Sequence, residues 1–190
     1  MQHRSSRRKA CQLPPFVLDE EGYIIDQGHL EKVPFGWFST REKGCGWIAA
    51  YNLLKMNGME EPASQVICEL ERYGFPGKVF GQEIVWLLLY LRHKGFAVCL
   101  SRPGCRGCEE MMQRCSTGIL MYLHRRGAHY AACRAAEDGR VHLYNAIYQK
   151  KDHIVPIREF LEEYSVLHGA VMIGCRPRMA VIRRGKSNSR

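Results

Sequence analysis

The stretch Lys43–Leu54, KGCGWIAAYNLL, places Cys45 between two glycines at the start of an apolar segment. From Trp47 to Met56 the apolar residues cover nearly every side of a helix, which is typical of a helix that is buried all round. Asn57-Gly58 is a common stop signal for a helix. We therefore expect the central helix of the domain to run from about Cys45 to this signal.

A thiol at the start of a helix lies beside unpaired backbone N–H groups and the positive end of the helix dipole. Both favour the thiolate, which is the nucleophilic form of cysteine. Arg41 and Lys43 would lower the pKa of the thiol further if they lie near it. Cys45 is therefore the candidate nucleophile.

Two further candidates follow in the second half of the chain. His129 lies 84 residues after Cys45, and Asn145 lies 16 residues after His129. A thiolate that attacks an acyl carbon forms a thioester and needs a base to accept and return a proton, a role that we assign to His129. An amide oxygen of Asn145 would hold the imidazole in one tautomer, as the third member of a triad does.

The other segments change from helical to extended patterns along the chain. Helices are expected at residues 62–73, 82–94, 107–115 and 156–164, and strands at 96–100, 118–124, 128–135, 141–144 and 170–175, with an edge hairpin formed by 16–18 and 22–25. This order predicts an α+β domain in which the cysteine-bearing helix packs against an antiparallel sheet. The site would lie in a cleft between the helical half and the sheet half.

The relative position of His129 and Asn145 follows from the expected hairpin. With Asp138-Gly139 at its tip, simple pairing places Asn145 opposite Ala132, about three positions from His129. A looser turn or a bulge would bring the two side chains together.

Length and composition indicate a single domain. The chain has 190 residues, of which 46% are hydrophobic, enough for one core. We expect the domain at residues 13–178, between basic tails at 1–12 and 179–190. No secretory signal is visible, and the longest apolar run, Ile84–Leu91, is far below the roughly 20 residues that span a bilayer. We expect a cytoplasmic protein without membrane insertion.

The nine cysteines are odd in number and spread along the chain, which favours a reduced protein. Four of them form a rival constellation: Cys99, Cys105, Cys108 and Cys115. The spacing of Cys105 and Cys108 is one that zinc sites use, but the other two cysteines are spaced irregularly. Zinc at this cluster stays an alternative, and we expect no cofactor.

The net charge of +9 suits an anionic partner, although part of the excess lies in the two ends, at Arg4–Lys9 and Arg176–Arg190. No nucleic-acid readout motif accompanies the charge. A basic protein that associates with nucleic acid is therefore kept as an alternative from another functional class.

Gly44-Cys45-Gly46 at the start of a buried helix, followed by a hairpin with His129 and Asn145, resembles the papain-like cysteine peptidase superfamily. The likeness is closest to bacterial double-glycine leader peptidases and their stand-alone relatives. The resemblance implies a papain-like fold, a nucleophile at Cys45, an acid/base at His129 and an orienting group at Asn145. It also implies a peptide or protein substrate and a bacterial source.

The sequence departs from this family at the oxyanion hole. Its members usually carry a glutamine about six residues before the cysteine, where this chain has Ser39, followed by Thr40. These two hydroxyls are candidate oxyanion donors beside the backbone N–H of Cys45. Without a donor there, the alternative is a catalytically silent papain-like module that binds a peptide or protein.

Overall fold

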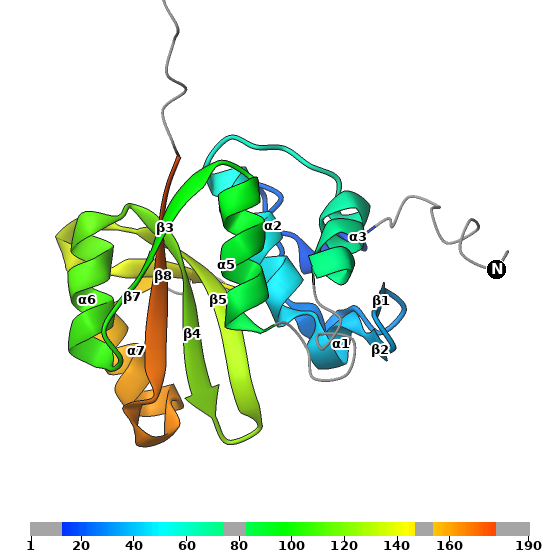
Figure 1. Cartoon of the computed structure of the whole chain (residues 1–190). Coiled ribbons are helices and arrows are strands. Elements are labelled where there is room, and N and C mark those ends of the chain that lie inside the picture. The colour runs from blue at the N-terminus through cyan, green and yellow to red at the C-terminus, as the bar shows by residue number, and fades with distance from the viewer. Residues whose placement is uncertain (1–12, 74–82, 147–153, 178–190) are drawn as a thin grey trace, which may run out of the picture.

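The computed structural model describes residues 13–73, 83–146 and 154–177. Over these residues the chain forms a six-stranded antiparallel sheet with helices on both sides (Figure 1). The expected α+β class, with the cysteine-bearing helix packed on the sheet, is confirmed. The two expected basic tails fall outside the described residues.

The helices and strands carry the labels of Figure 1. The helices are α1 Thr40–Lys43, α2 Cys45–Met56, α3 Ala63–Tyr73, α5 Ile84–His93, α6 Cys105–Arg114 and α7 Ile157–Tyr164. The strands are β1 Pro34–Phe35, β2 Phe38–Ser39, β3 Phe96–Leu100, β4 Thr117–His124, β5 Gly127–Ala135, β6 Val141–Tyr144, β7 Ile154–Val155 and β8 Ala170–Pro177. Each expected helix and each expected strand of the sheet therefore has a counterpart, and its ends agree or are shifted by one or two residues.

The sheet has the strand order β3-β8-β4-β5-β6-β7. The hairpin of β4 and β5 forms its middle, and β8 inserts between β3 and β4. Helices α2, α3 and α5 lie on one side of the sheet, and α6 and α7 lie on the other (Figure 1). We call these the α2 side and the α6 side.

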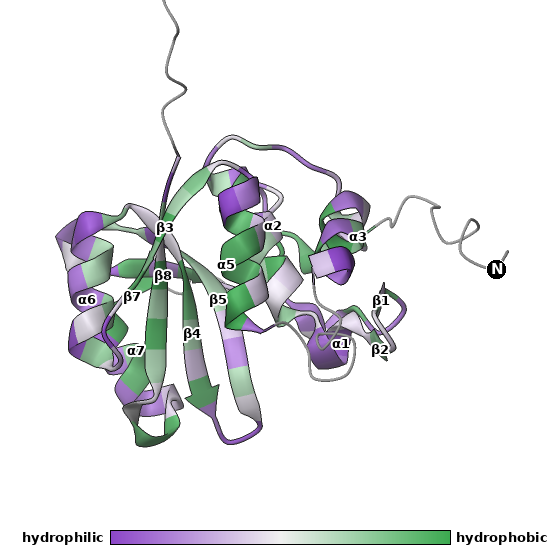
Figure 2. Ribbon diagram, in the orientation of Figure 1, coloured by the Kyte–Doolittle hydropathy of each residue, from purple (hydrophilic) through white to green (hydrophobic). Residues whose placement is uncertain are grey.

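Each side of the sheet has its own hydrophobic core. Trp47 and Leu53 of α2 are fully buried against Tyr130 and Ala132 of β5, and Figure 2 shows the hydrophobic residues concentrated along α5, β4 and β8. The core of the α6 side includes buried cysteines and methionines among its aliphatic and aromatic residues. Since alternate strand residues face opposite sides, both sets come from the same strands.

The segment before α2 holds its first turn in place. α1 is a short helix that the sequence did not predict, and Gly44 joins it to Cys45. A Cβ at Gly44 would lie 2.5 Å from the carbonyl oxygen of Thr40, so only glycine fits here without a shift of the backbone. The glycine before the cysteine therefore has a packing role.

A partly buried ion-pair group joins the end of α5 to α3 and the residue pair before it. Lys94 Nζ lies 2.7 Å from Glu61 Oε2 and 2.6 Å from Glu69 Oε2, and it lies over the ring of Tyr90. Burial opposes the charge of Lys94, but the hydrogen bonds and charges of the two carboxylates outweigh it, so the pKa of Lys94 is raised. The helical layer is thus joined by polar as well as apolar contacts.

Two expectations about pairing were wrong. Residues 16–18 and 22–25 do not form a two-stranded hairpin: Pro15–Val17 is a 3-10 turn, and a single bridge joins Leu18 to Ile24. In the second case Ala132 pairs with Tyr144, one residue earlier than expected. The turn at Glu137–Gly139 places both Asp138 and Gly139 at positive φ, and the five-residue connection 136–140 that contains it sets the register.

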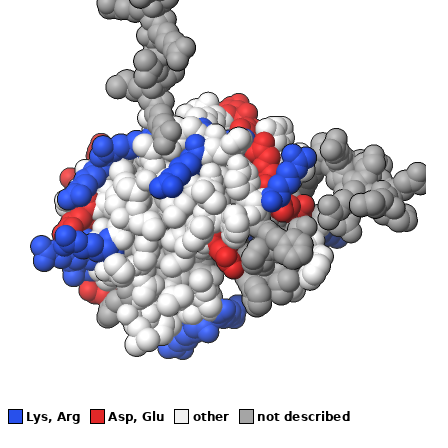
Figure 3. Space-filling view, viewed as in Figure 1, with Lys and Arg blue, Asp and Glu red and all other residues white. Residues whose placement is uncertain are grey.

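None of the helices in the described part of the chain is long and apolar enough to cross a membrane. On the face shown in Figure 3, Lys and Arg alternate with Asp and Glu around the rim, and the centre carries few charges. This face shows no extended patch of one sign, the feature that a nucleic-acid surface would need.

Candidate active site

The sulfur of Cys45 lies at the first residue of α2 and contacts the middle of the sheet. The side chain is half-buried, and the backbone N–H groups of Tyr130, Gly46 and Cys45 itself lie near enough to the sulfur to oppose the rise in the pKa of the thiol. Two of these donors belong to the free start of the helix, as the sequence predicts. The third comes from β5, from the residue that follows His129.

The acidity of Cys45 differs from the sequence-based expectation. Burial raises the pKa of its thiol above the usual value, while the N–H groups of Tyr130, Gly46 and Cys45 and the charge of Lys43 oppose the rise. The desolvation of a thiolate outweighs the helix start, because the sulfur lies against the apolar core of α2. In this structure Cys45 is therefore a neutral thiol at neutral pH, and the expected lowering of its pKa is wrong.

The ring of His129 is held by the backbone of Asn145. His129 Nε2 lies 2.6 Å from the carbonyl oxygen of Asn145. Since a carbonyl only accepts hydrogen bonds, Nε2 carries the proton and Nδ1 is left with a free lone pair. Nδ1 is therefore the nitrogen that can accept a proton from a thiol.

The surroundings of His129 keep its ring neutral. The side chain is buried, and it packs edge-on against Tyr122 and His124. Burial lowers the pKa of His129 to about 4, with a further lowering by His124 and an opposing contribution from the carbonyl of Asn145. A neutral imidazole at pH 7 is the form that a general base requires.

Cys45 and His129 approach β5 from its two sides. Tyr130 belongs to the core around α2, whereas His129 shares a side with its cross-strand partner Tyr122, part of the other core. β6 pairs with β5 only from Ala132 onward, so no described strand covers that edge of β5 before it. No hydrogen bond between Cys45 and His129 occurs among the described residues.

Asn145 adopts a backbone conformation that asparagine tolerates better than most residues. Its φ is 58°, in the left-handed region, and this turn directs its carbonyl at His129 just after β6 ends. The side-chain amide points elsewhere: Oδ1 accepts the backbone N–H of Gln27 at 3.0 Å, and Nδ2 donates to Gln27 Oε1 at 3.1 Å. Asn145 thus contacts His129 through its backbone, where the sequence predicts a side-chain contact.

Gln27 is a residue of the site that the sequence did not reveal. It pairs with Asn145 through its backbone and side chain, and its Nε2 donates to the carbonyl oxygen of Arg41 at 2.9 Å. It therefore links the end of β6 to the turn before Cys45. No local pattern marks a contact between residues 118 positions apart.

The two candidate oxyanion donors are occupied by other partners. Ser39 caps α1, and its N–H and Oγ both donate to Glu42 Oε2, at 3.0 and 2.9 Å. Thr40 is fully buried, and its Oγ1 accepts from Trp47 Nε1 at 3.1 Å. Both hydroxyls support the α1–α2 junction, and the N–H groups at the start of α2 are the donors that lie at the sulfur.

The four cysteines of the zinc alternative do not converge on one point. Cys99 interacts with Cys115, while Cys108 lies 3.9 Å from Ser101 Oγ. Within residues 13–73, 83–146 and 154–177, no three or more His, Cys, Asp or Glu side chains are grouped so as to hold a metal ion.

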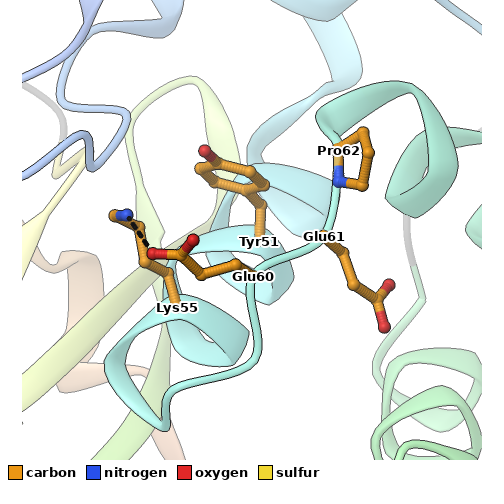
Figure 4. Close-up of a pocket in the computed structure, with 5 residues that line it drawn as sticks. All are labelled: Tyr51, Lys55, Glu60, Glu61 and Pro62. Carbon is orange, nitrogen blue, oxygen red and sulfur yellow. Dashed lines mark hydrogen bonds and ion pairs between the residues drawn. The ribbon is translucent and has the colours of Figure 1, made fainter.

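A shallow pocket lies at the other end of α2. Figure 4 shows its lining residues, which are Tyr51, Lys55, Glu60, Glu61 and Pro62. Lys55 pairs with Glu60 at 3.5 Å, and Lys55 is ten residues beyond Cys45, or about 15 Å along the helix. This pocket is therefore separate from the candidate site.

Comparison with known proteins identifies the fold. No family model and no curated protein matches the sequence. The structure is similar to the crystal structure of the peptidase domain of Streptococcus ComA, a bi-functional ABC transporter involved in a quorum sensing pathway. The TM-score is 0.51 at 13% sequence identity, and the match covers 72% of this chain and 93% of the ComA chain. The expected α+β, papain-like fold is thereby confirmed.

Proposed function

We propose that this protein is a cysteine peptidase or a related amide hydrolase that acts through a thioester at Cys45. One observation carries the proposal: α2, which begins at Cys45, packs on β5, and the N–H of Tyr130, directly after His129 on β5, opposes the rise in the pKa of the Cys45 thiol. His129 has a free Nδ1 in its neutral form. The fold shared with a peptidase domain supports the same chemistry.

In the proposed reaction the thiol is activated only when substrate is attacked. Sγ of Cys45 bonds to the carbonyl carbon while His129 Nδ1 takes the thiol proton, and the carbonyl electrons move onto its oxygen. The tetrahedral intermediate then expels the amine, which takes the proton back from Nδ1. Water attacks the thioester with the help of Nδ1, releasing the carboxylic acid and restoring the thiol.

The neighbours of the reacting groups have defined parts in this scheme. The Asn145 carbonyl oxygen accepts a hydrogen bond from Nε2–H of His129 and stabilises the positive charge of the imidazolium. The N–H groups of Cys45 and Gly46 lie at the helix start, where they can stabilise the oxyanion. The ring of His129 must move toward the sulfur around the open edge of β5, since no hydrogen bond joins them here.

The substrate class follows from the family resemblance rather than from a shaped pocket. We propose a peptide or protein substrate, as the resemblance to leader peptidases implies, in a bacterial cytoplasm. The eight described cysteines are all free thiols, which supports a reducing compartment.

An acylation experiment tests the proposal. The reduced protein is mixed with p-nitrophenyl acetate, and the release of nitrophenolate is followed while peptide mapping locates the acetyl group. We expect a burst of one equivalent with the acetyl group on Cys45, lost in C45A and at least about 100-fold slower in H129Q. C68S is the matched control, because Cys68 is a partly exposed thiol on α3. Equal acylation of several thiols, unchanged in H129Q, would refute the enzyme.

The second candidate is a silent papain-like module, which the hydrogen bonds of Ser39 and Thr40 favour. Ser39 Oγ donates to Glu42 Oε2 and Thr40 is fully buried, so neither hydroxyl is presented to a substrate oxyanion. A silent module would bind peptides without acylation, so a peptide that binds wild type and C45A equally and is never cleaved would support it. Cleavage of that peptide by wild type alone would support the hydrolase.

A further inference from the structure

Three sulfur atoms from different parts of the chain meet on the α6 side of the sheet. Cys99 Sγ of β3 lies 3.4 Å from Met111 Sδ of α6, and Cys115 Sγ, just before β4, lies 4.0 Å from the same Sδ. The thiols of Cys99 and Cys115 also interact with each other, and Cys115 raises the pKa of Cys99. We call these three residues the sulfur trio.

A glycine of β8, Gly174, lies directly against the sulfur trio. A Cβ at Gly174 of β8 would lie 2.5 Å from Met111 Sδ and 2.8 Å from Cys115 Sγ. Gly174 is the cross-strand partner of Cys99, so the absence of a side chain at this position is what allows the three sulfur atoms to come together.

The spacing of the sulfur trio matches that of a small metal site. Three sulfur ligands placed about 2.3 Å from a metal in one plane lie about 4 Å from one another. Two thiolates and a thioether are soft ligands, which select monovalent copper among the biological metals. Zinc sites are built from thiolate, imidazole and carboxylate ligands, and the trio has only two thiolates.

The surroundings suit a bound cation with a net negative ligand set. Cys99 is exposed, whereas Met111 and Cys115 are buried, so Cys99 gives the ion a route from solvent to the buried ligands. Arg114 and Arg176 act on Cys99 with positive charge, and Arg176 donates to the carbonyl oxygen of Arg114. Two thiolates with one monovalent ion carry a net charge of minus one, which these guanidinium groups offset.

We propose that Cys99, Met111 and Cys115 form a three-coordinate binding site for monovalent copper. Binding replaces the two thiol protons, which are released to solvent, and forms two copper–thiolate bonds and one copper–thioether bond with no change in oxidation state. The site is on the opposite side of the sheet from Cys45 and does not depend on the proposed hydrolase activity.

A second group of sulfur atoms nearby supplies a comparison. Cys133 Sγ lies 3.7 Å from Met112 Sδ and 3.4 Å from Met172 Sδ. Cys133 and Met172 are fully buried, so this group lacks the exposed ligand that the sulfur trio has. Met112 is also the chain neighbour of Met111 on α6, which makes it a matched control.

The test is a competition for copper under anaerobic, reducing conditions. The full chain is titrated with monovalent copper in the presence of bathocuproine disulfonate, whose absorbance reports the copper it holds. We expect wild type to retain one equivalent. We expect M111L and C99S to bind at least about 10-fold more weakly, because each loses a ligand, and M112L and C68S to bind as wild type does. X-ray absorption of the complex should show three sulfur ligands.

Several outcomes would overturn the proposal. One is that wild type retains no copper, and another is that M111L and C99S retain as much as M112L and C68S, which would place the ion elsewhere. A third is that copper is not held but a mild disulfide oxidant joins Cys99 to Cys115, which would make the pair a redox couple. C99S changes an exposed residue, so its result stands even if M111L does not fold.

Discussion

On the α2 side of the sheet, the sulfur of Cys45 lies against three backbone N–H groups, whereas on the α6 side Cys99 and Cys115 lie against the sulfur of Met111. Donors that surround a sulfur stabilise the negative charge that develops in nucleophilic attack. Sulfur neighbours instead form a set of soft ligands. The same residue type is thus suited to attack on one side and to metal binding on the other, because of the atoms around it.

The largest expected effect concerns the reaction of Cys45, on the α2 side, and not the sulfur trio. H129Q removes the base but keeps an amide N–H that can reach the carbonyl of Asn145, so we expect acylation of Cys45 to fall about 10²–10⁴-fold. C99S, on the α6 side, should acylate at the wild-type rate. Burst kinetics on both variants measure this, and an equal loss in the two would show that the sides are not independent.

The next largest expected effect is on the stability of the fold at low pH, which depends on the buried ring of His129. The pKa of His129 is about 4 in the fold against 6.5 when unperturbed, so the unfolded state binds the extra proton between these values. Stability from this group is fully present above pH 6.5 and is lost as the pH falls toward 4, by about 3 kcal/mol. Urea unfolding at pH 7.5 and pH 4 gives the loss in the free energy of unfolding for wild type and for H129Q. The difference between the two losses is the contribution of His129. A pH dependence that is the same in both proteins would contradict the burial of a neutral ring.

Added methyl groups probe how rigid each side is. In G44A the new Cβ meets the backbone carbonyl of Thr40 at 2.5 Å, and in G174A it meets the flexible end of Met111 at the same distance. Backbone yields less than a methionine side chain, so we expect losses of about 3 kcal/mol for G44A and about 1 kcal/mol for G174A. Urea unfolding gives both values, and the reverse order would show that the sulfur trio is the more tightly packed region.

The smallest expected effect distinguishes the role of the backbone carbonyl of Asn145 from that of its side-chain carboxamide. N145G keeps the positive φ that directs the carbonyl at His129, whereas N145A disfavours it by about 1 kcal/mol. If the carbonyl orients the ring, N145A should acylate about 10-fold more slowly than N145G. Equal losses in both variants would instead assign the orienting role to the carboxamide.

The parts of the fold that could be predicted from the sequence are those with local signals. The apolar residues around α2 and the stop at Asn57-Gly58 indicated its position, and the extended patterns around His129 predicted β4, β5 and β6. The register of β5 with β6 was wrong by one residue because it depends on the turn at Glu137–Gly139. Turn conformation at Asp138 has no unique sequence signature.

The site was predictable in its residue types but not in its contacts. Asn145 contacts His129, but through a backbone oxygen, and no hydrogen bond joins Cys45 to His129 among the described residues. The raised pKa of Cys45 depends on burial by residues distant in the sequence, and the contact of Gln27 with Asn145 joins segments 118 residues apart. Such effects arise from tertiary packing.

The pH dependence of Cys45 alkylation tests the central claim most directly, which is that Cys45 is a neutral thiol and His129 a neutral imidazole before substrate binds. Iodoacetamide labelling of Cys45 is followed by peptide mass spectrometry from pH 5.5 to pH 9. We predict a rate constant that rises about tenfold per pH unit across this range, as for a thiol whose pKa is not lowered. A rate that is high and constant from pH 5.5 to pH 8 would show a preformed thiolate–imidazolium pair and contradict the account.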